Sequence, residues 1–277
     1  MNTQRPEKNI CVNLLWTGGW DSTFRLLQLL LRHRVPVVPH YLEDPTRPST
    51  QIELETMARI RDCLRIAYPH TRGLLQPLRI ASVGNVAEDA EIDRALQDIR
   101  EKVFIGSQYS WLPAYCKHGA IGNMELGVHV DDKVQALLRS FAMEFEHPAG
   151  FHSIRVDPRH SGSPEFTLFG YFSFPLFHID KVGIGRQATA EGWDAIMEMT
   201  WFCHRPSHGK PCGICAPCVY TIEEGLAHRI PASRRVLSYF YRRFALPMKA
   251  PLRRMRTSLH GHRAGRRRSA PGTSRHP

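Results

Sequence analysis

The sequence predicts an α/β fold in which a doubly wound parallel sheet is flanked by helices. Short apolar segments alternate with helical segments over most of the chain, which is the pattern of a parallel sheet with helical crossovers. The first apolar segment, residues 10–16, is almost entirely apolar, as expected for a strand covered on both faces. A glycine turn and a helix follow it directly.

The first half of this pattern begins with the strand at 10–16. Trp20, Phe24, Leu27 and Leu31 then recur at helical spacing. Residues 35–42 predict a second strand and residues 74–82 a third. Between them, residues 51–67 predict an amphipathic helix, with Ser49 or Thr50 available as its N-cap.

The middle of the chain predicts helices at 90–101 and 107–117 and a fourth strand at 123–130. Residues 131–145 begin with two acidic side chains and predict another helix. From 147 to 171 proline, glycine, serine and charged residues dominate, and this composition predicts a loop or an insertion.

The last third predicts a short extended segment at 173–177 and a helix at 180–191. A cysteine-rich stretch and helices near 217–228 and 233–244 follow. We therefore expect an α/β domain at 1–192, a zinc-binding helical region at 193–246 and a basic, disordered tail at 247–277.

Charge is distributed unevenly along the 277 residues. The formal net charge is +11, but residues 249–277 hold nine of the 37 lysines and arginines and no acidic residue. The rest of the chain is therefore nearly neutral. From the charge of the tail we expect at most a weak contact with nucleic acid. No apolar run is long enough for a membrane span, and the N-terminus has no signal-like apolar run, so we expect a cytoplasmic protein without membrane contact.

The turn after the first strand is the first candidate site. Two adjacent glycines allow close approach of backbone N–H groups to an oxyanion, and the helix N-terminus adds positive partial charge. Hydroxyl and carboxylate side chains follow at once. The predicted phosphate-binding residues are Trp16, Thr17, Gly18, Gly19, Trp20, Asp21, Ser22 and Thr23.

The second candidate site is a group of four cysteines with metal-ligand spacing. Cys203, Cys212, Cys215 and Cys218 follow an x8–x2–x2 pattern, and a C-x2-C pair places two thiolates on one side of a tight turn. Four thiolates would close the shell of a structural Zn²⁺. An iron–sulfur cluster is the alternative, and His204 or His208 could replace one ligand.

The glycine turn resembles a known family signature. Thr17-Gly18-Gly19-x-Asp21-Ser22 is similar to the S-G-G-x-D-S motif of the PP-loop ATP pyrophosphatases, with Thr17 in place of the first serine. The resemblance implies an adenine nucleotide alpha hydrolase-like, Rossmann-like fold. It also implies cleavage of Mg²⁺-bound ATP between the α and β phosphates, with catalytic roles for Asp21 and Ser22.

The C-terminal half resembles one branch of that family, the 7-cyano-7-deazaguanine synthases. The similar residues are Phe174-Pro175-Leu176, Asp180-Lys181, Gly192, Thr200-Trp201-x-Cys203 and Pro211-Cys212-Gly213-x-Cys215-x2-Cys218. The resemblance implies that Lys181 contacts ATP phosphates, that the zinc is structural and that the protein is a homodimer. It implies a carboxylic acid substrate that is adenylated and then converted with ammonia to an amide and a nitrile.

Two other functions remain open at this point. One is a PP-loop enzyme that modifies tRNA, to which the basic tail would contribute. The other is a zinc-stabilised nucleotide-binding module without catalysis. Residues 41–48 lack the Gly-Gln-x-His stretch of the synthases, so the resemblance assigns no residue to the substrate.

Overall fold

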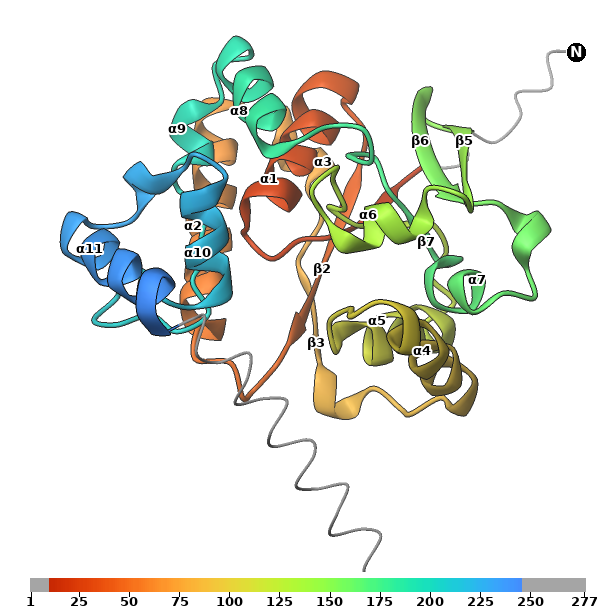
Figure 1. Ribbon diagram of the computed structural model, residues 1–277. Helices are drawn as coiled ribbons and strands as arrows, with labels where there is room; N and C mark the ends of the chain where they lie inside the picture. The colour runs from red at the N-terminus through yellow and green to blue at the C-terminus, as the bar shows by residue number, and fades with distance from the viewer. Residues whose placement is uncertain (1–9, 246–277) are drawn as a thin grey trace, which may run out of the picture. The chain divides into compact units, whose positions relative to one another are not determined.

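A computed structural model describes residues 10–245 and contains one seven-stranded sheet (Figure 1). The strand order is β3-β2-β1-β4-β7-β6-β5. The first five strands in this order pair in parallel, and β6 and β5 are antiparallel additions at one edge. The strands are β1 (Val12–Leu15), β2 (Val37–Glu43), β3 (Arg79–Ser82), β4 (Met124–Glu125), β5 (Ala142–His147), β6 (Phe151–Val156) and β7 (Phe172–Ser173). This arrangement confirms the predicted fold class.

Helices cover both faces of the sheet, which explains why β1 is nearly all apolar. Val12 and Leu14 face one buried cluster, and Leu15 packs against the other. The first face carries α1 (Trp20–Leu27) with a π-helix at Gln28–His33, α2 (Thr50–Ala67), α3 (Thr71–Leu74), α8 (Lys181–Ala190) and α9 (Asp194–Met197). The opposite face carries α4 (Ala90–Lys102), α5 (Gln108–His118), α6 (Lys133–Leu138) and α7 (Pro164–Phe169).

The strand order reverses between β1 and β4. From β1 the chain continues outward through β2 to β3, and it then returns to place β4 on the other side of β1. In open α/β sheets ligands bind outside the carboxyl ends of the strands at such a switch point. The segments that leave β1 and β4 are therefore the expected walls of a binding site.

The predicted helix over 131–145 ends early, at Leu138, and residues 147–171, predicted as a loop or an insertion, contain regular secondary structure. Within 131–145 only α6 is helical, and β5 and β6 form an antiparallel hairpin with register pairs such as Phe145↔Ser153. The alternation of Met143 and Phe145 with glutamates is a strand pattern, and Gly150, with φ of 81°, closes the turn. Within the predicted loop, α7 also contributes Leu168 and Phe169 to the core.

The chain divides after Gly209 into two units. The described part of the second unit, residues 210–245, contains α10 (Ala216–Glu223), a 3₁₀ turn (Ala227–Arg229), α11 (Ala232–Phe240) and a π-helical turn (Tyr241–Ala245). The predicted tail at 247–277 lies outside the described residues. Within residues 10–245, none of the helices combines the length and the apolarity that crossing a bilayer requires.

Candidate functional site

The loop that joins β1 to α1 lies at the switch point. Its first residue, Trp16, extends the strand, because its N–H donates to the His40 carbonyl at 2.9 Å. Across the crevice the segment after β4 comes close to α1: a Cβ placed on Gly127 would lie 3.1 Å from the Cβ of Asp21. Gly127 belongs to no recognisable sequence motif, and only the structure shows that it allows the segment after β4 to approach Asp21.

The two glycines shape the loop in different ways. Gly18 has φ of 67°, a left-handed conformation that strains other residues, and a Cβ there would meet Met57 Cγ at 3.1 Å. The Gly18 carbonyl accepts a hydrogen bond of 2.9 Å from the N–H of Trp201. Gly19 is the N-cap of α1, and no side chain caps this helix end. The positive partial charge of this helix end favours an anion beside it.

The predicted loop side chains divide into buried and accessible groups. Trp16 and Thr23 are fully buried, and the Trp16 indole N–H donates to Thr23 Oγ1 at 3.0 Å. These two side chains therefore stabilise the loop and do not face a ligand. The Ser22 hydroxyl donates to the Gly19 carbonyl and accepts from the Thr17 N–H, both at 3.4 Å. Trp20 packs towards α8, with a ring atom 3.8 Å from a Cβ built on Gly185.

Asp21 and Lys181 meet although 160 positions separate them. Lys181 Nζ lies 4.0 Å from Asp21 Oδ2, and both side chains are partly exposed. Asp180, the N-cap of α8, accepts a hydrogen bond of 2.6 Å from the Gly183 N–H and so fixes the start of the helix that carries Lys181. Among the described residues no donor reaches the buried Asp21 Oδ1. A buried carboxylate oxygen of this kind fits a Mg²⁺ ligand.

A buried ion pair holds α1 against β4. Arg25 Nε and Nη2 each donate to a carboxylate oxygen of Glu125 at 2.7 Å, and both side chains are at most 4% exposed. Arg25 also donates to Gln28 Oε1 at 3.2 Å and lies 4.6 Å from the ring centre of Phe151. The pair joins the two elements that form the switch point. Sequence reasoning missed it, because neither residue belongs to a local motif.

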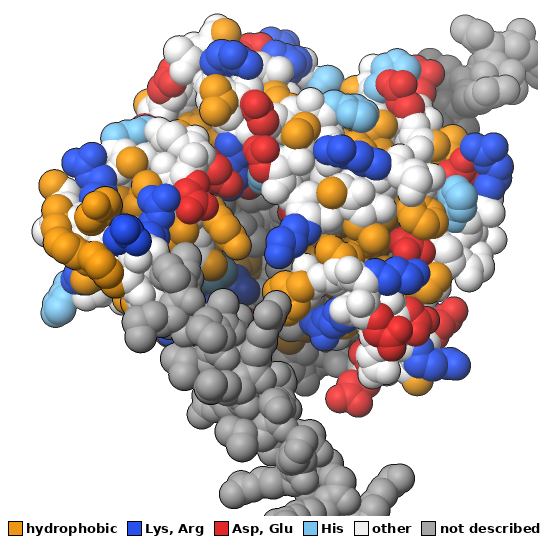
Figure 2. Space-filling view, in the orientation of Figure 1, with side chains coloured by type: hydrophobic (Ala, Val, Ile, Leu, Met, Phe, Trp, Pro, Cys, Tyr) orange, Lys and Arg blue, Asp and Glu red, His pale blue; other side chains and the backbone are white. Residues whose placement is uncertain are grey.

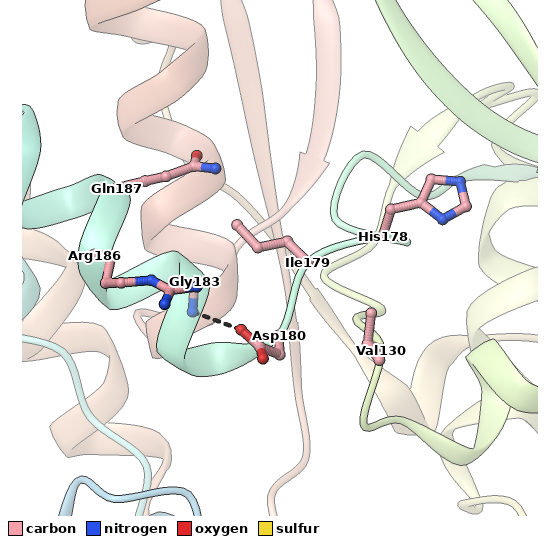
Figure 3. A pocket seen from close by; sticks show the side chains of 7 residues that line it. All are labelled: Val130, His178, Ile179, Asp180, Gly183, Arg186 and Gln187. Atoms are coloured by element: carbon pink, nitrogen blue, oxygen red, sulfur yellow. Dashed lines mark hydrogen bonds between the residues drawn. The ribbon is translucent and has the colours of Figure 1, made fainter.

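A cavity of about 340 Å³ lies beside the start of α8 (Figure 3). Val130 contributes from the segment after β4, and Arg186 and Gln187 contribute from α8. His178 projects from the chain that leads into the helix, on the other side of Asp180 from Arg186. Two of the lining residues lie close in sequence to residues that approach Asp21: Val130 follows Gly127 by three positions, and Asp180 directly precedes Lys181. This cavity is therefore the natural candidate for a second ligand.

The four predicted metal ligands come together. The sulfur atoms of Cys203, Cys212, Cys215 and Cys218 all lie within 4.8 Å of one another. Within this group, Cys212 Sγ and Cys218 Sγ are 3.9 Å apart. Sulfur atoms on one tetrahedral zinc, at about 2.3 Å from the ion, would stand about 3.8 Å from each other. The group can therefore hold a metal ion.

Local backbone structure prepares this cysteine group. The N–H groups of Ile214 and Cys215 donate to Cys212 Sγ at 3.5 and 3.3 Å, which stabilises a thiolate. Gly213 between them has φ of 83°, and a Cβ there would lie only 2.5 Å from the Arg234 carbonyl oxygen. Cys215 is the N-cap of α10. The C-x2-C pattern thus predicted the turn correctly.

No protein-family model matches the sequence, and a search of curated proteins finds no significant match. Among solved structures, the chain is similar to the U34-tRNA thiolase NcsA from Methanococcus maripaludis with its [4Fe-4S] cluster. The similarity has 13% identity and a TM-score of 0.41, and it covers 86% of this chain and 73% of that one. At this level it carries no argument about function.

Proposed function

We propose that this protein activates a substrate carboxylate by adenylation with ATP and releases pyrophosphate. The observation that carries the proposal is the meeting of Asp21 and Lys181, 4.0 Å apart, beside a helix end that no side chain caps. Backbone N–H groups, an ammonium group and a carboxylate with a free oxygen are the groups that bind a triphosphate and its magnesium. They lie at the switch point of the sheet, where ligands of this fold class bind.

The reaction follows from these groups. The N–H groups at the start of α1 hold phosphate oxygens, and the Lys181 ammonium compensates negative charge that develops on the leaving group. Mg²⁺, when bound at Asp21, supplies further charge neutralisation. A substrate carboxylate oxygen forms a bond to the α-phosphorus while the bond to the bridging oxygen breaks, and pyrophosphate leaves with the electron pair. Positioning by the protein accounts for most of the rate enhancement.

The cavity beside α8 is the proposed site of the acid. Arg186 provides a guanidinium group suited to a carboxylate, and Gln187 provides an amide. By analogy with the synthases that the sequence resembles, ammonia then displaces AMP to give an amide. A second ATP adenylates the amide oxygen with release of pyrophosphate, and the C–O bond breaks as AMP leaves with that oxygen and the nitrogen loses its protons to give a nitrile. In this proposal the four cysteines hold a structural zinc, and the active form is a homodimer.

A second candidate is a PP-loop enzyme that modifies tRNA. The second unit favours it, because α11 and the turn after it expose aromatic and basic side chains together (Figure 2). The side chains of three aromatic residues are each more than half exposed: Tyr239, Phe240 and Phe244. The rings of Phe240 and Phe244 stack with their centroids 6.2 Å apart. Stacking platforms among cations are typical of single-stranded nucleic-acid binding. A non-catalytic nucleotide-binding module is the third candidate.

Product analysis distinguishes these functions. The purified protein is incubated with Mg²⁺, ATP and a panel of carboxylic acids, with and without ammonia, and in parallel with unmodified tRNA. The proposal predicts AMP and pyrophosphate that depend on one of the acids. ADP and phosphate would contradict it, AMP formation that depends on tRNA alone would favour the second candidate, and ATP binding without any product would favour the third.

A matched pair of variants connects turnover to the site. Lys181→Met removes the ammonium group beside Asp21 and is expected to lower pyrophosphate release by about 100-fold or more. Lys102→Met makes the same chemical change at an exposed position near the end of α4 and should leave the rate unchanged. Equal rates for the two variants would contradict the assigned role of Lys181.

A further inference from the structure

A second cavity, of about 420 Å³, lies beside the carboxyl end of β3. Ala81 and Ser82 line it from the strand, Val86 and Ala87 from the segment that follows, and Tyr115 and His118 from α5. Tyr115 packs against the cluster on the α4–α5 face, whereas α1 lies on the opposite face. The cavity is therefore separate from the proposed phosphate site, and nothing in the proposed reaction uses it.

A buried polar chain leads from the sheet to this cavity. His40 on β2 is fully buried, with Nε2 3.0 Å from Asn13 Oδ1 and Nδ1 2.8 Å from the Tyr115 hydroxyl. Burial, with a contribution from the nearby Arg79 charge, lowers the pKa of His40 to about 4, so the imidazole is neutral at pH 7. Three elements contribute one residue each to this chain.

The proton positions in this chain follow from its chemistry. The Asn13 amide is placed with Oδ1 towards the ring, and in this orientation His40 Nε2 carries the single imidazole proton, because an amide oxygen only accepts. His40 Nδ1 is then an acceptor, and the Tyr115 hydroxyl must donate its proton to it. The phenol oxygen is left with lone pairs and no proton to offer. Tyr115 therefore presents an acceptor with a fixed orientation.

The rest of the cavity lining limits the ligand further. No lysine, arginine or acidic side chain is among the described residues that line it, and alanine, valine and glycine contribute alongside the hydroxyl of Ser82 and the amide of Asn85. Its volume is at the lower end of the range for small-molecule sites, about 300–1,000 Å³. An uncharged ligand is favoured, because a charged one would be partly desolvated without a counter-charge.

We propose that this cavity binds a neutral, planar heteroaromatic molecule and that Tyr115 accepts a hydrogen bond from an N–H group of the ligand. The apolar lining contacts the two faces of the ligand ring. The hydrogen-bonded series Asn13–His40–Tyr115 leaves Tyr115 only an acceptor, so the ligand must present an N–H group at the edge that faces Tyr115. This site is independent of ATP, so the proposal stands or falls separately from the proposed reaction.

Two probes of the same shape test it. Indole carries an N–H group, and benzofuran has an oxygen at that position. Each is titrated into the full-length protein without nucleotide and followed by ¹⁵N-edited NMR. The proposal predicts that indole shifts amides near Tyr115 and that benzofuran binds about threefold or more weakly, the contribution of one hydrogen bond. Failure of indole to bind there, or equal binding of both probes, would overturn it.

Three variants make the result specific. Tyr115→Phe should make the two probes bind equally, whereas Tyr220→Phe, the same change at a side chain that is 53% exposed, should preserve their difference. Ala87→Leu, at an exposed position of the lining, should weaken both probes without affecting the fold. If Tyr115→Phe fails to fold, the Ala87→Leu result still decides whether the probes occupy the cavity. Unchanged binding in that variant would contradict the proposal.

Discussion

Replacing Glu125 by glutamine tests whether the buried ion pair fixes α1 against β4. The substitution keeps the shape of the side chain but removes the charge opposite Arg25. The guanidinium, only a few per cent exposed, then remains buried without an anion. Removing one partner of a buried pair typically destabilises a protein by about 3–5 kcal/mol.

The contacts that remain set the expected magnitude. The substituted glutamine would keep one carbonyl oxygen as an acceptor, and Arg25 would keep Gln28 at 3.2 Å and the Phe151 ring at 4.6 Å. We therefore expect a loss near the lower limit, about 3 kcal/mol. For a protein with a total stability of about 5–15 kcal/mol, this is a large fraction.

Urea unfolding at pH 7, followed by circular dichroism, measures the loss. The control is the double variant Arg25→Met/Glu125→Leu, which removes both charges and fills a similar volume. It should be more stable than Glu125→Gln, because no uncompensated charge remains. A single variant within about 1 kcal/mol of the wild type, or a double variant less stable than the single, would refute the reasoning.

Three further predictions concern other parts of the molecule. The pKa of His40 is lowered from 6.5 to about 4 in the folded protein, so between these pH values the unfolded state binds a proton that the folded state does not. The stability of the protein should therefore be complete with respect to His40 above pH 6.5 and fall by about 3 kcal/mol as the pH falls towards 4. In urea unfolding at pH 7 and 5, His40→Gln should reduce this dependence. Cys215→Ser should lose the bound metal in elemental analysis, whereas Cys63→Ser, outside the cysteine group, should retain it. Gly18→Ala should destabilise the protein by about 1–2 kcal/mol through its positive φ, whereas the same change at Gly73, where a Cβ has open space, should not.

Local patterns accounted for much of the fold. The apolar strand, the glycine turn and the helix over residues 10–31 were predictable, because each depends on neighbours in sequence. The hairpin of β5 and β6 was not. The acidic residues at 131 and 132 and the leucines at 137 and 138 indicate a helix, and that signal concealed the alternation that begins at Met143. Register between strands that are far apart in the sequence, as in Leu14↔Glu125, is a long-range property.

The candidate site shows the same limit. The four cysteines were predictable as a group, because their spacing along the chain imposes their proximity in space. The proposed contact of Lys181 with ATP phosphates came only from a resemblance, since nothing in its sequence neighbourhood distinguishes it from a surface lysine at a helix start. Arg25 and Glu125, 100 positions apart, gave no signal, because a charged residue on a helix usually faces water. Contacts of this kind depend on the strand order.

The most direct test of the account is a crystal structure of the protein with Mg²⁺ and a non-hydrolysable ATP analogue. The account predicts that the β and γ phosphates lie against the backbone N–H groups of residues 19–22, with Lys181 Nζ and the Asp21-bound ion beside them. Nucleotide density at another place on the sheet, with this loop empty, would contradict it.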